Sequence, residues 1–425
     1  MKDTLALYRN ILYRPYLDAF YNLPESVKSM ISPRKPLFRF FRMAGYTFLR
    51  LIGNLFETVE HPEKLKGKVW LYVVSQNNYD SLKFIADTLP ETVLVAGQNK
   101  DIGKYHNVVE RISLRRKILY YYKFPYLLFQ FLKRRPEITL RFVDVLYDAV
   151  GFYEVYHQKL QQFKPAAIVF ANDHNPDARA MLLAAKALGI KTAYVQHASV
   201  STTFPPLQFD LSLLEGQDSL DKYIECGPIT GEVKLIGMPK ADAFVSARNR
   251  NRTIRTIGIG ASLLDLIEEL EKLTRKLSNC LPEVRIIVRP HPRDKRDFTY
   301  LQSIAPTVSI SDSSKEPTFE YLQHLDVMIS SNSSVHLEAV LMNVWSIYYN
   351  FNSIEPLHDV YGYVAQGLVE AISTPEKLCD MLTARLQDKP DVFLRARYYN
   401  ATVGTPYDGK SSELALQHIA NFTSQ

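Results

Sequence analysis

The chain has 425 residues, of which 46% are hydrophobic and 23% are charged. These proportions are typical of a soluble globular protein and exclude a disordered or membrane-embedded chain, and the length predicts two domains. The net charge of +6 is modest, and no nucleic-acid-binding motif accompanies it, so we expect no nucleic acid partner.

The three cysteines, Cys226, Cys280 and Cys379, lie far apart and form no CxxC pair. We therefore expect neither disulfides nor a zinc site, and a reducing compartment fits best. Charged residues interrupt the apolar residues at the N-terminus, so we expect no signal peptide and no membrane span there. The predicted location is the cytoplasm.

The segment 111–135, RISLRRKILYYYKFPYLLFQFLKRR, places Arg and Lys among Tyr, Phe and Leu. This composition suits an anionic bilayer, so one interpretation is a peripheral contact with the inner face of the plasma membrane. The alternative is a helix packed on the protein core whose basic side chains reach the solvent.

From residue 69 onward, short β-branched and aromatic runs alternate with amphipathic segments, which is the pattern of βαβ units on a parallel sheet. The first half is predicted to contain strands at 69–74, 92–96, 166–171, 191–195, 211–214 and 233–236, and helices near 79–88, 138–163 and 177–189. The second half is predicted to contain strands at 256–260, 284–289, 307–310, 325–330 and 345–349, and helices near 262–279, 316–323, 333–343, 375–388 and 411–421.

A polar, basic stretch at 246–255 separates the two halves and is interpreted as a linker. The sequence therefore predicts an α/β protein with two doubly wound, Rossmann-like domains, 1–245 and 256–425, which face an interdomain cleft. Ligands of such folds bind beyond the carboxyl ends of the parallel strands, so the residues that follow strands are the candidates for a site.

Four hydrogen-bonding residues, Ser331, Asn332, Ser333 and Ser334, follow the strand at 325–330 and precede a helical pattern that includes Glu338. Backbone amides and hydroxyls at a helix N-terminus favour an anion such as a phosphate. Because the helix dipole contributes only ~0.3–1 kcal/mol, a further partner is needed. The alternative is ordinary N-capping by Ser333 or Ser334.

The stretch IIVRPHPRD ends the strand at 284–289 with His291 fixed between two prolines and preceded by Arg289. His291 is predicted to lie at the same edge of the second sheet as the serines, with Gly260 at the end of the strand at 256–260. A hydrogen bond from this imidazole to a phosphate contributes ~1.5–3 kcal/mol. The glycines form neither a dinucleotide fingerprint nor a P-loop, so we expect no cofactor and no metal.

In the first half, Asp173 follows the strand at 166–171 and is a candidate general base or nucleophile, although Asp is also common in turns and caps. His197 follows the strand at 191–195, and Glu215 follows the strand at 211–214 as an alternative base. The remaining candidates are expected on the acceptor side: His174, Arg179 and Ser199.

These motifs together resemble GT-B glycosyltransferases of bacterial surface-polysaccharide assembly. The resemblance rests on RPHP at 289–292, SSNSSVHLE at 330–338, VQHAS at 195–199 and GMPKAD at 237–242. Similar His-Pro and Ser-Ser motifs occur in bacterial polysialyltransferases, in Kdo transferases of capsule synthesis, and in CDP-glycerol glycerophosphotransferases of teichoic-acid synthesis. The family's paired acidic residues followed by Gly are not found as such.

The resemblance implies that His291, Ser333 and Ser334 hold the phosphate of the donor. It further implies metal-independent transfer of a sugar from a cytidine nucleotide, CMP-Kdo or CMP-sialic acid first, to a glycan or lipid-linked acceptor in capsule or lipopolysaccharide synthesis. Three alternatives stay open: a CDP-glycerol or CDP-ribitol phosphotransferase, a nucleotide-sugar 2-epimerase, and a noncatalytic assembly scaffold.

Overall fold

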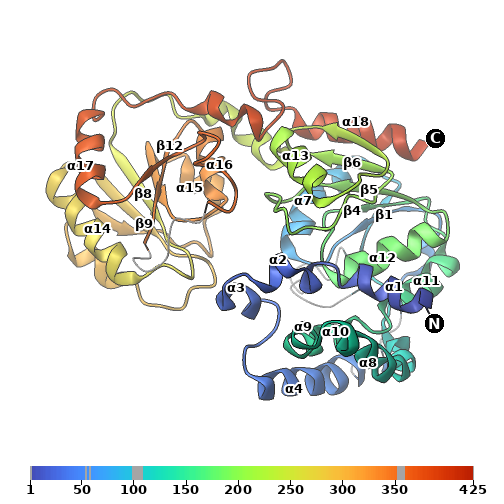
Figure 1. Ribbon diagram of the computed structural model, residues 1–425. Coiled ribbons are helices and arrows are strands. Elements are labelled where there is room, and N and C mark those ends of the chain that lie inside the picture. Colours follow the sequence, from blue (N-terminus) through green and yellow to red (C-terminus); the bar gives the residue numbers. More distant parts are fainter. Residues whose placement is uncertain (1, 53–54, 57–58, 98–108, 352–358, 425) are drawn as a thin grey trace. The chain divides into compact units, whose positions relative to one another are not determined.

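The computed structural model describes residues 2–52, 55–56, 59–97, 109–351 and 359–424 (Figure 1). The chain divides into two compact units. The first contains Met1–Leu214, Leu220–Leu235 and Ala415–Gln425, and the second contains Glu215–Ser219 and Ile236–Leu414. The chain therefore contributes Glu215–Ser219 to the second unit, enters it again at Ile236 and returns to the first at Ala415, which differs from the expected boundaries.

The polar stretch at 246–255 is part of the second unit and is not the expected linker. Its Asn249 amide donates hydrogen bonds to the carbonyl oxygen of Leu325, at 2.6 Å, and to the carboxylate of Asp326, at 2.8 Å. The stretch lacks apolar periodicity because its polar side chains bind the neighbouring backbone and Asp326 instead of filling a core.

The first unit is built on a sheet whose seven described strands are all parallel. Their order across the sheet is β3 (Glu110–Arg111), β2 (Thr92–Ala96), β1 (Val69–Tyr72), β4 (Ala167–Phe170), β5 (Lys191–Val195), β6 (Leu211–Leu214) and β7 (Glu232–Leu235). Residues in β1, β4 and β6 are buried throughout, as expected for strands covered on both faces. The six predicted strands are confirmed, and the short β3 was not predicted.

Helices cover this sheet and form a further group away from it. Those that connect or flank strands are α1 (Lys2–Ile11), α6 (Pro62–Leu65), α7 (Gln76–Thr88), α11 (Phe152–Phe163), α12 (Pro176–Ala187), α13 (Gln217–Cys226) and α18 (Ser411–Ser424). Figure 1 shows α1, α11 and α12 lying together, and they are neighbours in the structure. The separate group comprises η1 (Arg14–Tyr16), α2 (Asp18–Tyr21), α3 (Glu25–Ser29), α4 (Pro36–Gly45), η2 (Tyr46–Ile52), η4 (Arg115–Lys123), α8 (Phe124–Arg134), α9 (Pro136–Arg141) and α10 (Val143–Ala149).

The single helix predicted over 138–163 is instead three helices, α9, α10 and α11. Gly151 separates the last two with a φ of +89°, a left-handed conformation that glycine adopts without strain. A Cβ at this position would also lie 2.8 Å from the Lys117 backbone oxygen. The apolar period continues through the break, so the sequence pattern alone suggested one helix.

The second unit has a sheet of six described strands, again all parallel. Their order is β10 (Val308–Ile310), β9 (Arg285–Arg289), β8 (Thr256–Gly260), β11 (Val327–Ser330), β12 (Trp345–Tyr349) and β13 (Glu370–Ile372). The helices are α14 (Ile267–Cys280), α15 (Thr318–Leu322), α16 (Val335–Leu341) and α17 (Pro375–Ala384), with shorter turns η5 (Pro239–Ala247), η6 (Thr299–Ser303) and η7 (Phe393–Tyr398). All five predicted strands are confirmed, and β13 was not predicted.

A disulfide joins Cys280 at the end of α14 to Cys379 in α17, and Cys226 is free and buried. The expectation of no disulfide was therefore wrong. The two cysteines are 99 residues apart in sequence, and their Cα atoms lie 6.3 Å apart because α14 and α17 pack as neighbours in the fold. Among the helices of the described chain, none combines the length and apolar character needed to cross a bilayer.

Candidate functional site

The first group of candidate residues lies where β4 and β5 end. These strands are neighbours in the first sheet, so Asn172–His174 and Gln196–Ser199 follow them at the same edge. The backbone after β4 is held by Asn172, whose side-chain oxygen accepts from the amides of His174 at 3.2 Å and Asn175 at 2.9 Å. This turn fixes the backbone at Asp173 and His174, which lie between Asn172 and Asn175.

Asp173 and His174 form a hydrogen-bonded pair. Asp173 is only 2% exposed, and its carboxylate lies 2.9 Å from His174 Nδ1 and accepts a 2.7 Å hydrogen bond from the Tyr223 hydroxyl. Burial would raise the pKa of Asp173, but His174, Tyr223 and His197 together hold it below the usual value. The carboxylate is therefore ionised, and His174 Nδ1 carries the proton that it accepts.

This geometry differs from the expectation that Asp173 itself is the base. Both carboxylate oxygens are engaged by protein groups, and a lowered pKa makes a carboxylate a poor proton acceptor. The His174 ring is partly exposed, and in the neutral ring Nε2 is the unprotonated nitrogen when Nδ1 donates to Asp173. Of the two side chains, His174, which the sequence placed on the acceptor side, is therefore the one with a nitrogen that can accept a proton.

A second imidazole and an aromatic ring accompany His174. The rings of His174 and His197 are nearly parallel with centroids 6.5 Å apart, and the Phe204 ring lies 4.4 Å from His174. Ser199 lies half-buried in the segment after β5. The structure thus brings together three of the predicted residues: Asp173, His174 and His197.

Arg179, for which the sequence suggested an acceptor-side role, lies in the first turn of α12, where the charges of Asp173 and Tyr223 act on it. It is 1% exposed, and its guanidinium donates to the side-chain oxygens of Asn10 and, at 2.9 Å, Gln208. Burial lowers the pKa of Arg179 to about 10, while the charge of Asp173 acts in the opposite direction. Arg179 is better explained as a buried structural cation that ties α1 to α12.

Glu215, the alternative base, belongs to the second unit. Burial raises the pKa of Glu215 to about 7, Lys240 partly opposes the increase, and Glu338 adds to it. Lys240 Nζ lies 2.5 Å from Glu338 Oε1. Glu338 was predicted to contact the donor, but it is paired with Lys240, whose motif GMPKAD had no assigned role.

The second group of candidates lies where β9, β8 and β11 end. Arg289 pairs with Gly260, and Gly260 pairs with Ser330, so the three strands end level with one another. With a strand spacing of ~4.8 Å, the segments after β9 and β11 are roughly 10 Å apart. His291 and the serines therefore lie on either side of Gly260, as the sequence predicted.

His291 is half-buried in a tight turn. Its Nδ1 accepts a hydrogen bond from the Arg293 amide at 3.1 Å, and its carbonyl oxygen accepts from the Asp294 amide at 2.8 Å. Burial and the charge of Arg293 lower the pKa of His291, and Asp294 opposes them only in part. The ring is therefore neutral at pH 7 and presents Nε2–H as a donor.

Two buried residues that the sequence analysis missed hold the Ser331–Ser334 segment. The Ser331 hydroxyl donates to Asp265 at 2.7 Å, and His336 Nε2 donates to the Ser331 carbonyl oxygen at 2.8 Å. Burial lowers the pKa of His336 to about 4, so this ring is neutral, and its Nδ1 lies 2.7 Å from the Ser346 hydroxyl. Ser331 is thus a supporting residue and not a free phosphate ligand.

The remainder of the segment is open to ligands. Asn332 and Ser333 are half-buried and Ser334 is exposed. Ser333 Oγ accepts from the Val335 amide at 3.3 Å, while Ser334 makes no side-chain cap. Within the part of the chain that the structure describes, the backbone amides of Ser333 and Ser334 have no acceptor. These two amides can donate to an anion.

Two other residues predicted on the donor side have close neighbours within the second unit. Arg289 is 8% exposed and donates to the Ser311 hydroxyl at 2.8 Å and to the Glu316 carbonyl oxygen at 2.5 Å, and the Glu316 carboxylate is 3.2 Å away. A Cβ at Gly260 would lie 2.5 Å from Cε of Met328, the far end of a flexible side chain that can move aside. The contacts of Arg289 are those of a structural residue.

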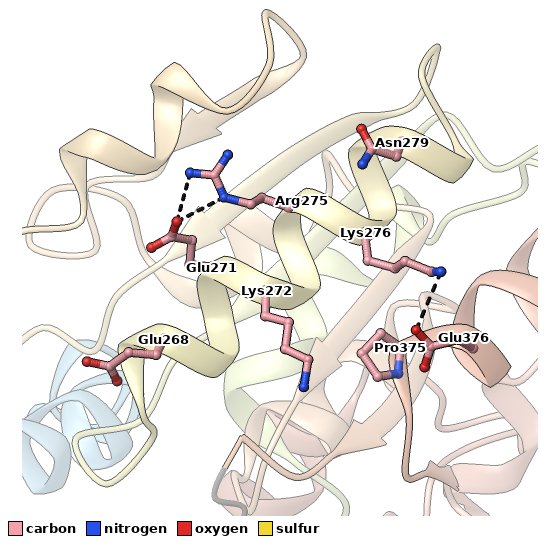
Figure 2. A pocket seen from close by; sticks show the side chains of 8 residues that line it. All are labelled: Glu268, Glu271, Lys272, Arg275, Lys276, Asn279, Pro375 and Glu376. Atoms are coloured by element: carbon pink, nitrogen blue, oxygen red, sulfur yellow. Dashed lines mark hydrogen bonds and ion pairs between the residues drawn. The ribbon is translucent and has the colours of Figure 1, made fainter.

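A surface hollow of about 510 Å³ lies on the outer side of α14 and α17 (Figure 2). Its charged side chains pair with one another, as in Glu271 with Arg275 at 2.7 Å and Lys276 with Glu376 at 3.4 Å. It contains none of the residues that the sequence predicted for the site, and we do not place the site there. Among the described residues, no group of three or more His, Cys, Asp or Glu could hold a metal ion.

The two parallel sheets and the comparison with solved structures define the fold class as GT-B. CalG4, the calicheamicin glycosyltransferase, has a TM-score of 0.56 at 10% identity, covering 84% of this chain and 98% of its own. The kitacinnamycin glycotransferase has a TM-score of 0.55 at 13% identity, covering 84% and 99%.

UDP-GlcNAc 2-epimerase from Neisseria meningitidis, solved with UDP-GlcNAc bound, is similar to the same extent. Its TM-score is 0.55 at 13% identity, covering 83% of this chain and 100% of its own. No protein-family model matches the sequence, and no curated protein does. At these identities the similarity shows the GT-B fold alone.

Proposed function

We propose that this protein is a glycosyltransferase that uses a nucleotide-activated sugar and a glycan or lipid-linked acceptor. The observation that carries the proposal is the arrangement at the edge of the second sheet, where His291 and the Ser333 and Ser334 amides lie on either side of Gly260. Neutral donors that point to one edge suit the phosphate of a donor. The GT-B fold supports this reading, because both glycosyltransferases and nucleotide-sugar epimerases have it.

In the proposed reaction, His174 Nε2 accepts the proton of an acceptor hydroxyl while the oxygen of this hydroxyl attacks the anomeric carbon of the donor sugar. The bond from that carbon to the donor phosphate breaks, and the nucleotide leaves with the electron pair. Asp173 keeps the proton on His174 Nδ1 and stabilises the imidazolium that forms. His291 Nε2–H and the Ser333 and Ser334 amides stabilise the charge on the leaving phosphate. No metal takes part.

The finer assignment follows the motif resemblance. We propose a cytidine nucleotide donor, with CMP-Kdo or CMP-sialic acid first, and a role in bacterial capsule or lipopolysaccharide synthesis. The solved relative with bound UDP-GlcNAc makes uridine nucleotides the necessary comparison. Thermal unfolding with CMP, CDP, UDP and GDP tests this, because a ligand that binds the folded protein raises the melting temperature. Stabilisation by UDP and not by CMP or CDP would contradict the cytidine assignment.

An epimerase is the second candidate, because a solved relative of this fold is named as one. An epimerase converts its nucleotide sugar without an acceptor, whereas a transferase releases nucleotide only when an acceptor hydroxyl or water is available. Incubating the protein, without an acceptor, with sugars activated by the nucleotide that stabilises it distinguishes an epimerase from a transferase. Conversion of the sugar with the nucleotide still attached would overturn the transferase proposal.

A further inference from the structure

Helix α4 in the first unit is oriented opposite to the usual amphipathic helix of a soluble protein. Its apolar side chains are in solvent: Leu37 is 62% exposed, Phe38 54%, Phe40 64% and Phe41 58%. A helix on the surface of a protein normally turns such residues toward the core. Contiguous exposed apolar side chains mark an interaction surface.

The arginines of α4 fix this orientation by binding inward. Arg39 is 8% exposed and donates to the backbone oxygens of Leu140 and, at 2.9 Å, Arg34. Arg42 forms a 3.0 Å ion pair with Asp144 of α10, a fully buried carboxylate. Rotating the helix to hide its phenylalanines would break these contacts and leave Asp144 without its cation, so the apolar face stays outward.

The apolar surface continues beyond α4. Phe48 of η2 is 65% exposed, and Phe56 is 86% exposed. The neighbouring η4 adds the exposed Leu119 and Tyr122, and α8, which packs against η4, adds the exposed Phe129. We call the exposed apolar residues of α4 and η2, together with these three, the aromatic surface.

The segments that carry the aromatic surface contain basic and no acidic residues. Residues 26–56 contain Lys28, Arg34, Lys35, Arg39, Arg42 and Arg50 and no Asp or Glu, and residues 111–135 are also without acidic residues. Arg34 and Lys35 at the start of α4 are exposed, as are Arg115 and Arg116 in η4. Exposed aromatic rings bordered by cations fit the headgroup region of an anionic bilayer.

We propose that the aromatic surface inserts into the interfacial layer of an anionic membrane, with α4 parallel to the bilayer plane. A second copy of the chain fits less well, because a symmetric contact would bring the same basic residues against each other. The sequence offers residues 111–135 as one candidate for a membrane contact, with a core-packed helix as the alternative. In the structure Leu127 and Phe131 of that segment are buried, so the core-packed alternative describes α8, and α4 is the main element of the surface.

Sedimentation of the full chain with vesicles tests this proposal, and no sugar donor is needed. We expect the protein to sediment with vesicles that contain phosphatidylglycerol and much less with phosphatidylcholine alone. Phe40→Ser/Phe41→Ser should reduce the partition coefficient between water and vesicles roughly tenfold or more, because the variant lacks two aromatic side chains that the wild type buries in the bilayer. The matched control, Ile224→Ser/Leu394→Ser, removes two other exposed apolar residues, 59% and 49% exposed, and should bind as the wild type does.

Several results would overturn the proposal. These are wild-type protein that stays in the supernatant, a Phe40→Ser/Phe41→Ser variant that sediments equally well, or a control variant that loses binding to the same degree. A wild-type dimer that this variant converts to a monomer, without vesicle binding, would identify a second copy as the occupant. Melting temperatures equal to that of the wild type verify that the variants are folded.

A fluorescent probe checks the geometry directly. The two native tryptophans, Trp70 and Trp345, are 0% and 3% exposed, so a Phe41→Trp variant adds one reporter in the aromatic surface. We expect lipids brominated on the acyl chains to quench this reporter on vesicle binding, since such helices insert ~5–10 Å. Unquenched emission at saturating vesicles would contradict insertion. These results are independent of the proposed reaction.

Discussion

The pairing of Asp173 with His174 makes a specific prediction for Asp173→Asn. The asparagine oxygen can keep the hydrogen bond from Tyr223, but its NH₂ group then faces His174 Nδ1 and requires that nitrogen to accept. The imidazole proton moves to Nε2, so His174 can no longer take a proton from a substrate. We expect transfer activity to fall about 10²–10⁴-fold, the usual contribution of a general base.

The same substitution should destabilise the first unit moderately. It replaces hydrogen bonds to a buried charge, worth about 1.5–3 kcal/mol each, with neutral ones worth about 0.5–1.5 kcal/mol each, and relief from burying that charge offsets part of the loss. The pKa of Asp173 is lowered in the folded protein, so its stabilisation is present above its unfolded pKa and is lost as the pH falls through the folded value. The variant should lack this component of acid sensitivity.

Long-range ¹⁵N–¹H NMR of the imidazoles measures the tautomer without a substrate. Wild-type His174 should be protonated on Nδ1 and the variant on Nε2. Tyr223→Phe is the matched control, because it removes the other hydrogen bond to Asp173 and should leave the tautomer unchanged. A wild-type His174 protonated on Nε2, or an unchanged tautomer in Asp173→Asn, would refute the reasoning.

Three further predictions concern the second unit. His291→Ala should weaken binding of the stabilising nucleotide about 10–100-fold, measured by calorimetry. Because His291 is neutral, the affinity of the wild type for this nucleotide should be constant from pH 7 to 8. A steep decline of the affinity over this range would indicate that His291 binds as a cation. Because the pKa of His336 is lowered to about 4 in the folded protein, this histidine takes up its proton at a higher pH in the unfolded chain. The free energy of unfolding, measured with urea, should therefore decrease as the pH falls from about 6.5 to about 4. His336→Gln should reduce this pH dependence. Cys280→Ser/Cys379→Ser should lower the free energy of unfolding by up to about 4.7 kcal/mol, and alkylation of the denatured, unreduced wild type should modify Cys226 alone.

Much of the fold could be predicted because parallel strands buried on both faces leave a strong local pattern. The runs at 256–260 and 327–330 are continuous in apolar or small residues, and the strand-end rule then placed His291 and Ser333 at one edge. The short β3 and β13 were missed because two or three residues carry no period.

The supporting contacts could not be predicted, because they join residues that are distant in the sequence. Asp265 reaches Ser331 across 66 positions, and Tyr223 reaches Asp173 across 50. The order of roles in the Asp173–His174 pair also depends on burial, which the sequence does not state. In α4, the pattern PLFRFFRM resembles an ordinary amphipathic helix, and only the partners of Arg39 and Arg42 show which face is inside.

The route of the chain between the two units has a consequence for how the protein is made. In the sequence, residues 236–414 of the second unit are inserted between Leu235 and Ala415 of the first unit. The C-terminal residues belong to the first unit, where Lys191 Nζ of β5 donates to the carbonyl oxygen of Phe422 at 3.4 Å. On the ribosome, residues 236–414 can therefore fold as soon as they emerge, while the first unit waits for 415–424 before its structure is complete. A nascent chain would expose the unfinished edge of the first unit for the whole time that the second is synthesised, and this is when a chaperone would be needed.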